Sequence, residues 1–253
     1  MTSPEAVRTP TCELPIPFSK PRMINALRLS FFLVFIGNAL MLARLTLPEF
    51  GRWLYNLTEL LLLGGLLWHA RRAWSEIGLT RAGLGKSAFT GLVTGFVLAT
   101  PPLVFFAFPI LLSGPVRHQE IASLSSQEYW LRVVFEVPLF TALFEEVAFR
   151  GVLQTRWSAL LGAARGMIAA NIFFAAWHLV VMTDSIQQTD LDVPFLPPLA
   201  EYGLAFVVGL SAVFIGGMAL SWLRHLTQNL AGSILAHWLV VAAMVTALYL
   251  RST

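Results

Sequence analysis

Long apolar runs dominate the chain, each close to the about 20 residues that a helix needs to cross a bilayer. About seven runs are present, at residues 24–47, 53–68, 87–112, 129–153, 167–182, 202–223 and 231–250. The third contains Pro101 and Pro102, and because proline removes a backbone donor that lipid cannot replace, it predicts a broken helix or two short segments. The pattern therefore predicts an all-α, polytopic transmembrane helical bundle of about seven spans, or eight if the third run crosses twice.

The composition supports this class and indicates an orientation. Hydrophobic residues make up 57% of the chain and charged residues 12%, with a mean hydropathy of +0.70. Most of the 17 Lys and Arg residues fall in the connections that are inside if the N-terminus is cytoplasmic. We therefore expect a multi-pass protein of the cell membrane, in a bacterium the inner membrane, and no nucleic-acid partner, because the basic residues form no single stripe.

The first 22 residues differ from the rest of the chain. They are polar and contain five of the 14 prolines, too many for a signal peptide. We expect residues 1–22 to be a disordered cytoplasmic tail and residues 23–253 to be one transmembrane helical domain. The single cysteine, Cys12, lies in this tail, so an intrachain disulfide is excluded.

Three ionisable residues stand inside the fourth run, in the stretch LFEEVAFRGVL at 143–153. A charge at membrane depth costs about 2.5 to 3.5 kcal/mol on insertion scales, so each one needs a partner or a function. Glu146 and Arg150 are four residues apart and can pair along one helix face. Glu145 is rotated about 100° from Glu146 and cannot share that arginine equally well. Burial beside a second carboxylate suits Glu145 to act as a general base, whereas two glutamates sharing one arginine for packing is the structural alternative.

Other charges in the runs receive a simpler interpretation. Arg132 and Glu136 are four residues apart near the outer end of the fourth run, a spacing that predicts an ion pair. Glu59, in the second run, has no role that the sequence assigns.

Two histidines lie deep in later apolar runs. His178 follows Phe173, Phe174 and Trp177, and His237 is equally far from any flanking charge. A lone histidine on an apolar helix is usually a core residue, but two on different spans, with an unpaired glutamate on a third, favour a shared site. A common depth near the middle of the membrane is feasible at about 1.5 Å of rise per residue, so we expect a base and two imidazoles to face one cavity.

These residues resemble a large family of intramembrane proteases, the CPBP or Abi family, which contains the CAAX prenyl endopeptidases and the bacteriocin-processing and immunity proteins. That family shows Glu-Glu-x-x-x-Arg, then Phe-x-x-x-His, then His-x-x-x-Asn on successive spans. The matches here are Glu145, Glu146 and Arg150, then Phe174 and His178, and finally His237. The resemblance places a protease-like core at about residues 76–250.

One position departs from the family pattern. Val241 stands four residues after His237, where the family commonly has an asparagine that helps to hold the developing oxyanion. Asn171 is a candidate substitute, because it precedes His178 by two helical turns. The resemblance implies that Glu145 takes a proton from water, that His178 orients this water, and that His237 faces the oxyanion. Glu146 and Arg150 would then hold the shape of the site.

The function expected is hydrolysis of a peptide bond in a membrane-associated protein or peptide, for instance at a C-terminal tail, by a glutamic-type endopeptidase. Two histidines and a carboxylate also suffice for a catalytic zinc site, with Glu145, His178 and His237 as ligands. No His-Glu-x-x-His motif is present, and we favour a metal-free site with zinc as the alternative. A non-catalytic transporter or immunity-type scaffold with a polar Glu/His core stays open as a second function.

Overall fold

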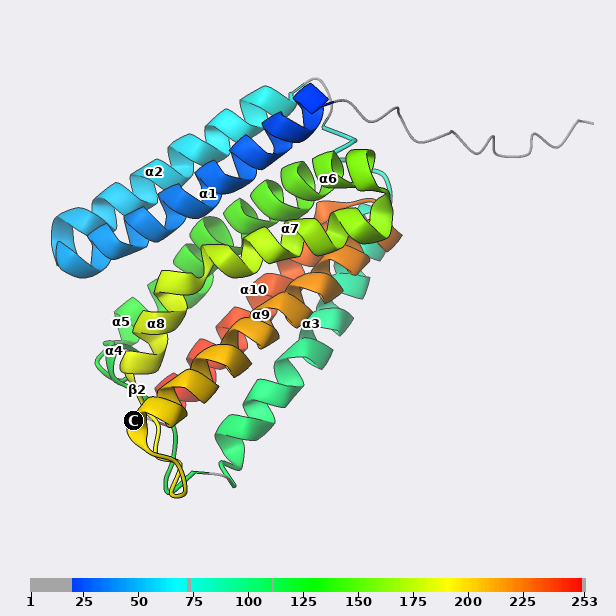
Figure 1. Ribbon diagram of the computed structural model, residues 1–253. Helices are drawn as coiled ribbons and strands as arrows, with labels where there is room; N and C mark the ends of the chain where they lie inside the picture. The colour runs from blue at the N-terminus through cyan, green and yellow to red at the C-terminus, as the bar shows by residue number, and fades with distance from the viewer. Residues whose placement is uncertain (1–19, 72–73, 111, 252–253) are drawn as a thin grey trace, which may run out of the picture.

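Helices make up most of the computed structural model, which describes residues 20–71, 74–110 and 112–251 (Figure 1). The first three helices are α1 (Lys20–Thr46), α2 (Pro48–Ala70) and α3 (Leu84–Ala107). The chain continues through β1 (Arg117–His118), α4 (Gln119–Ala122), α5 (Ser126–Leu131), η1 (Arg132–Leu143), η2 (Glu146–Leu153) and α6 (Gln154–Leu161). It ends with α7 (Ala163–Trp177), α8 (Leu179–Gln187), β2 (Thr189–Asp190), α9 (Pro198–Thr227) and α10 (Leu230–Leu250). The predicted all-α class is confirmed, and the predicted tail lies outside the described residues up to residue 19.

Two groups of helices make the bundle. The α1–α2 hairpin lies along α6 and α7, while α3, α9 and α10 pack together on the other side (Figure 1). Helix α10 touches α3 most extensively and also contacts η1 and α9. The contact between α3 and α10 is close because small residues line it: a Cβ on Gly232 would lie 2.6 Å from the carbonyl oxygen of Ser87. The Ser87 hydroxyl accepts a hydrogen bond from the Gly232 N–H at 2.9 Å, so α10 is held in register where it begins.

The fourth predicted run forms one long helical path from α5 through η1 and η2 to α6. A capping box between Ser125 and Glu128 starts it. Most of the path is π-helical, a form that is rare and often marks functional sites. Pro138 lies within η1 and has no N–H to donate, which favours a departure from regular α-helical hydrogen bonding. Glu145 lies between the two π-helical segments.

The other predicted runs fall on α1, α2, α3, α7 with α8, α9 and α10. Four helices, namely α1, α3, α9 and α10, are long and apolar enough to cross a membrane, and α7 with α8 makes a fifth if the bent pair is one span. The predicted number of seven or eight spans is not confirmed. The break predicted at Pro101 and Pro102 does not occur, and α3 continues through both prolines. Regular helical hydrogen bonding is present beyond them, where the Phe108 N–H donates to the Val104 carbonyl at 2.9 Å.

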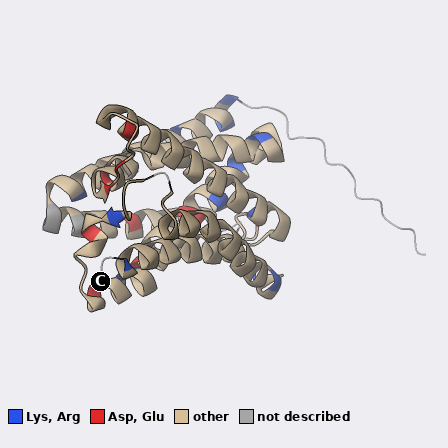
Figure 2. Ribbon diagram, turned by 90° about the horizontal axis from the view of Figure 1, so that it is seen from below, with Lys and Arg blue, Asp and Glu red and all other residues tan. Residues whose placement is uncertain are grey.

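The outer surface and the two ends of the bundle fit a membrane protein. Large apolar side chains are exposed along the helices, among them Phe35, Phe89, Phe96 and Val207. Lys and Arg gather where α1, α3, α7 and α10 begin, an end that we call the basic end (Figure 2). Its charged members among the described residues are Lys20, Arg22, Arg71, Arg81, Lys86, Arg156, Arg165 and Arg224, with Glu76 as the one acid.

The opposite end carries most of the described acids, including Glu120, Asp184, Asp190 and Asp192. The predicted pair of Arg132 and Glu136 is present at 3.7 Å. Arg132 lies closer to Glu120, at 2.5 Å, which the sequence pattern did not indicate because the partner comes from α4.

Candidate active site

Glu145, His178 and His237 come together from three separate helical segments. The Glu145 Oε2 atom lies 3.7 Å from Nε2 of His178 and 3.9 Å from Nε2 of His237. All three side chains are largely buried: their exposed fractions are 6% for Glu145, 15% for His178 and 10% for His237. One carboxylate and two imidazoles therefore face a common point inside the bundle.

A bend in the chain aims the His178 ring. Helices α7 and α8 meet at this residue at an angle of 46°, and the His178 N–H donates to the Ala175 carbonyl rather than four residues back. The Phe174 carbonyl is then free to accept from Nδ1 of the His178 ring, at 2.8 Å. Because a carbonyl only accepts, Nδ1 carries the proton in the neutral ring and Nε2 is left as an acceptor facing Glu145.

Glu146 performs the same task for His237. Its Oε1 atom lies 2.9 Å from His237 Nδ1 and accepts a hydrogen bond from Arg150 Nη1, also at 2.9 Å. Glu146 and Arg150 are essentially inaccessible to solvent, so each depends on the other for compensation of its charge. The predicted helical pair is present, and it directs Nε2 of His237 toward Glu145.

One carboxylate oxygen of Glu145 accepts a hydrogen bond, and the other accepts none from the described residues. Oε1 accepts from the indole N–H of Trp177 at 3.1 Å. Oε2 is buried and has no hydrogen-bond partner among the described residues. Trp177 was treated as part of an apolar patch in the sequence, although its buried indole N–H was a signal that an acceptor must lie nearby.

The Asn171 amide is hydrogen-bonded to groups other than the two imidazoles. Its Oδ1 accepts from Arg150 Nη2 at 3.3 Å, and its Nδ2 donates to Met167 O and to Ser221 Oγ, each at 2.8 Å. The amide that was a candidate for the missing asparagine is thus engaged with the arginine and with α9. Its geometry supports a role in positioning Arg150. Val241 has no polar group to offer.

Aromatic rings and one further acid surround the site. The Phe174 ring lies between the Arg150 guanidinium, 3.9 Å away, and the His178 ring, 4.6 Å away. Glu59 of α2 is 1% exposed and interacts with Tyr55 of its own helix and electrostatically with Glu145. The acid to which the sequence assigned no role therefore belongs to the surroundings of this site.

A metal site needs ligand atoms that converge on one point, and side chains that merely lie near each other do not suffice. Within the described parts of the chain, no group of three or more His, Cys, Asp or Glu side chains is arranged to hold a metal ion. His237 Nδ1 and His178 Nδ1 are both engaged with protein acceptors. Both Nε2 atoms are left facing Glu145, and a hydrogen-bonded Nδ1 is also usual in histidines that bind a metal through Nε2. We derive no step through a metal.

Comparison with known proteins gives one match. Residues 127–243 match the family model described as type II CAAX prenyl endopeptidase Rce1-like. The matched segment runs from the start of α5 into α10 and contains Glu145, His178 and His237. No curated protein and no solved structure shows a significant match to the chain.

Proposed function

We propose that this membrane protein is a CAAX-type intramembrane protease that hydrolyses a peptide bond with a water molecule activated by Glu145. The match of residues 127–243 to the Rce1-like family of type II CAAX prenyl endopeptidases supports this class. One observation carries the proposal. The hydrogen-bonding capacity of Glu145 Oε2 is unused, and two imidazole nitrogens face it from 3.7 and 3.9 Å.

The spacing between these atoms suits a water molecule. Distances of 3.7 and 3.9 Å exceed the range of a direct hydrogen bond, and polar atoms so separated are commonly bridged by water. A water there can donate one proton to Glu145 Oε2 and the other to His178 Nε2. The Trp177 indole holds the opposite oxygen of Glu145, so the carboxylate presents a fixed lone pair to this water.

The reaction follows from these positions. Glu145 takes a proton from the water while the oxygen attacks the carbonyl carbon of the substrate, whose π electrons move to its oxygen. His237, protonated and held by Glu146, donates Nε2–H to this oxyanion. Glu145 then passes its proton to the leaving amine as the carbon–nitrogen bond breaks.

The chain lacks the asparagine that commonly donates to the oxyanion in this family, and His237 replaces it only in part. His237 can supply one donor to the oxyanion, and Val241 supplies none. Loss of one such donor typically costs a factor of about 10² to 10³ in rate. We therefore propose a slow endopeptidase acting on a membrane-associated protein or peptide, with a C-terminal tail as one candidate substrate, in the cell membrane with its N-terminus cytoplasmic.

The test compares protein termini in membranes from cells that express the wild type, Glu145→Gln or Glu136→Gln. The amide oxygen introduced by Glu145→Gln can still accept from Trp177, so this variant should accumulate normally while the wild-type cleavage products disappear. Glu136 is 44% exposed in the same helical path and serves as the matched control, so its substitution should leave cleavage intact. Unchanged cleavage by Glu145→Gln would overturn the proposal, and loss of the protein from the membrane would favour the scaffold function instead.

A second measurement separates the two mechanisms. Purified protein dialysed against a chelator should retain its cleavage rate if Glu145 acts on water without a metal. Loss of that rate, followed by its return on addition of zinc, would refute the metal-free mechanism and leave the protease assignment standing.

A further inference from the structure

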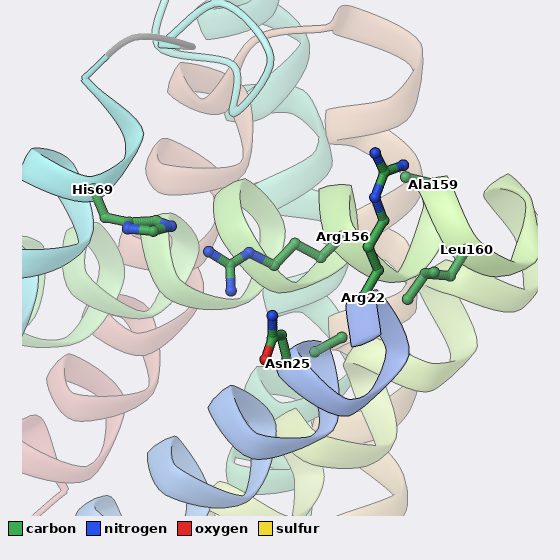
Figure 3. A pocket seen from close by; sticks show the side chains of 7 residues that line it. Arg22, Asn25, His69, Arg156, Ala159 and Leu160 are labelled. Atoms are coloured by element: carbon green, nitrogen blue, oxygen red, sulfur yellow. The ribbon is translucent and has the colours of Figure 1, made fainter. Parts of the chain in front are cut away.

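A cavity of about 390 Å³ opens at the basic end, apart from the candidate active site. Its lining comes from three helices: Arg22 and Asn25 of α1, His69 of α2, and Arg156 of α6 (Figure 3). Figure 3 shows Arg156 reaching across the cavity toward His69, above Asn25, with Arg22 at its side. The volume falls in the range of about 300 to 1,000 Å³ that is typical of small-ligand sites.

The charge of this cavity is uncompensated. Two guanidiniums, an imidazole and an amide line it together with small apolar groups, and no carboxylate does. Within the described ranges, neither Arg22 nor Arg156 forms an ion pair. Burial lowers the pKa of Arg156, and no acid opposes that effect. A half-buried guanidinium with five N–H donors and no anion is a costly arrangement that an anionic ligand would relieve.

The residues beside the cavity indicate that it lies at the level of the membrane surface. Trp68, one residue before His69, is 69% exposed, and Ile24, next to Asn25, is 43% exposed. The guanidinium of Arg71 stacks on the Trp68 ring at 4.0 Å. Exposed tryptophan beside arginine is typical of the interface between bilayer and water. The basic end, under the positive-inside rule, faces the cytoplasmic leaflet, where anionic lipids are exposed.

We propose that this cavity binds the phosphate of an anionic membrane lipid. Arg156 and Arg22 donate to the phosphate oxygens, for which guanidinium geometry is well matched. His69 and Asn25 can donate to the remaining oxygens of the headgroup, while the acyl chains leave along Ile24 into the bilayer. A lipid whose headgroup carries its own cation is disfavoured by the two arginines. One bound lipid would thereby join the α1–α2 hairpin to α6, independently of the proposed function.

Native mass spectrometry of the full chain in detergent tests the proposal with three probes: phosphatidylglycerol, phosphatidylcholine and inorganic phosphate. The wild type should retain one phosphatidylglycerol at concentrations where phosphatidylcholine does not bind. Arg156→Gln should weaken this binding by about tenfold, which corresponds to about 1.4 kcal/mol, because it removes a charge-assisted contact. Arg22→Gln, at an exposed position of the same cavity, should weaken it in the same direction and is less prone to misfold.

Arg165→Gln is the matched control, since Arg165 is an exposed arginine of α7 at the same end and does not line the cavity. Its affinity for phosphatidylglycerol should stay within about twofold of the wild type, which is about 0.4 kcal/mol. An equal loss in Arg165→Gln and Arg22→Gln would show unspecific attraction to the basic end and overturn the site. Binding of inorganic phosphate with the affinity of phosphatidylglycerol would overturn the lipid assignment, as would equal binding of the two lipids.

Discussion

Replacing Arg150 by methionine should destabilise the protein strongly, and replacing Glu146 by glutamine as well should restore part of the loss. Arg150 is 1% exposed and Glu146 is fully buried, with 2.9 Å between Nη1 and Oε1. Removing one partner of such a pair leaves an uncompensated charge and costs about 3 to 5 kcal/mol. The same change removes the hydrogen bond to Asn171, worth about 1 kcal/mol, and the stacking of the guanidinium on Phe174, worth up to about 2 kcal/mol.

The double variant Glu146→Gln with Arg150→Met removes both charges. The amide oxygen introduced by Glu146→Gln can still accept from His237, so the remaining loss is the Asn171 hydrogen bond and the stacking, together about 1 to 3 kcal/mol. The free energy of unfolding is measured by titrating purified protein in mixed micelles with a denaturing detergent. Fluorescence of the 8 tryptophans reports the transition.

Arg81→Met is the control, because Arg81 is exposed in the connection between α2 and α3. This substitution should change the free energy of unfolding by less than about 0.5 kcal/mol. The reasoning fails if Arg150→Met is no worse than the control. It also fails if the double variant is as unstable as Arg150→Met alone, since compensation of the buried charge would then contribute nothing.

Two further predictions concern helix packing and pH. Gly91→Ala should cost about 1 to 3 kcal/mol in the same titration, because its Cβ would lie 2.6 Å from the Gly232 Cα, whereas Gly85→Ala, with open space around it, should not destabilise. Equal effects of the two would refute the close packing of α3 on α10. Burial lowers the pKa of His118, whose Nδ1 accepts a hydrogen bond from the Ile121 N–H. The unfolded segment therefore binds protons more readily than the folded one. The stability of α4 should fall as the pH drops below 6.5. Amide hydrogen exchange at Ile121, corrected for intrinsic rates, should rise in that range, and His118→Asn should abolish the pH dependence by supplying an acceptor that does not titrate.

Much of the fold was predictable because lipid imposes a simple rule on sequence. A chain in a bilayer must satisfy its backbone hydrogen bonds internally, so apolar runs of sufficient length become helices. Helices cover most of every predicted run, and the all-α class is confirmed. The number of spans was harder to predict, because length and polarity alone do not show whether α2 or the π-helical path crosses the membrane. The effect of Pro101 and Pro102 was also beyond pattern reading, because a helix can tolerate lost donors where the following residues resume the bonding.

The candidate site divides in the same way. The spacing of Glu146 and Arg150 determined their pairing, because residues four apart share a helix face, and the family resemblance is confirmed by the match over residues 127–243. Local spacing carried no information on partners that arrive from other helices. Asn171 illustrates this: its position two turns before His178 suggested a shared face, yet Arg150 and Ser221 engage its amide.

The sequence by itself determined the chemistry available to this protein: helices, a membrane setting, and a glutamate and two histidines isolated in apolar surroundings. Only the tertiary structure decided how those groups meet. The bend at His178 turns one ring toward Glu145, and Glu146 directs the other from α10. These outcomes depend on contacts between residues as many as 91 positions apart, which helical periodicity does not encode because it acts within a few turns of one helix.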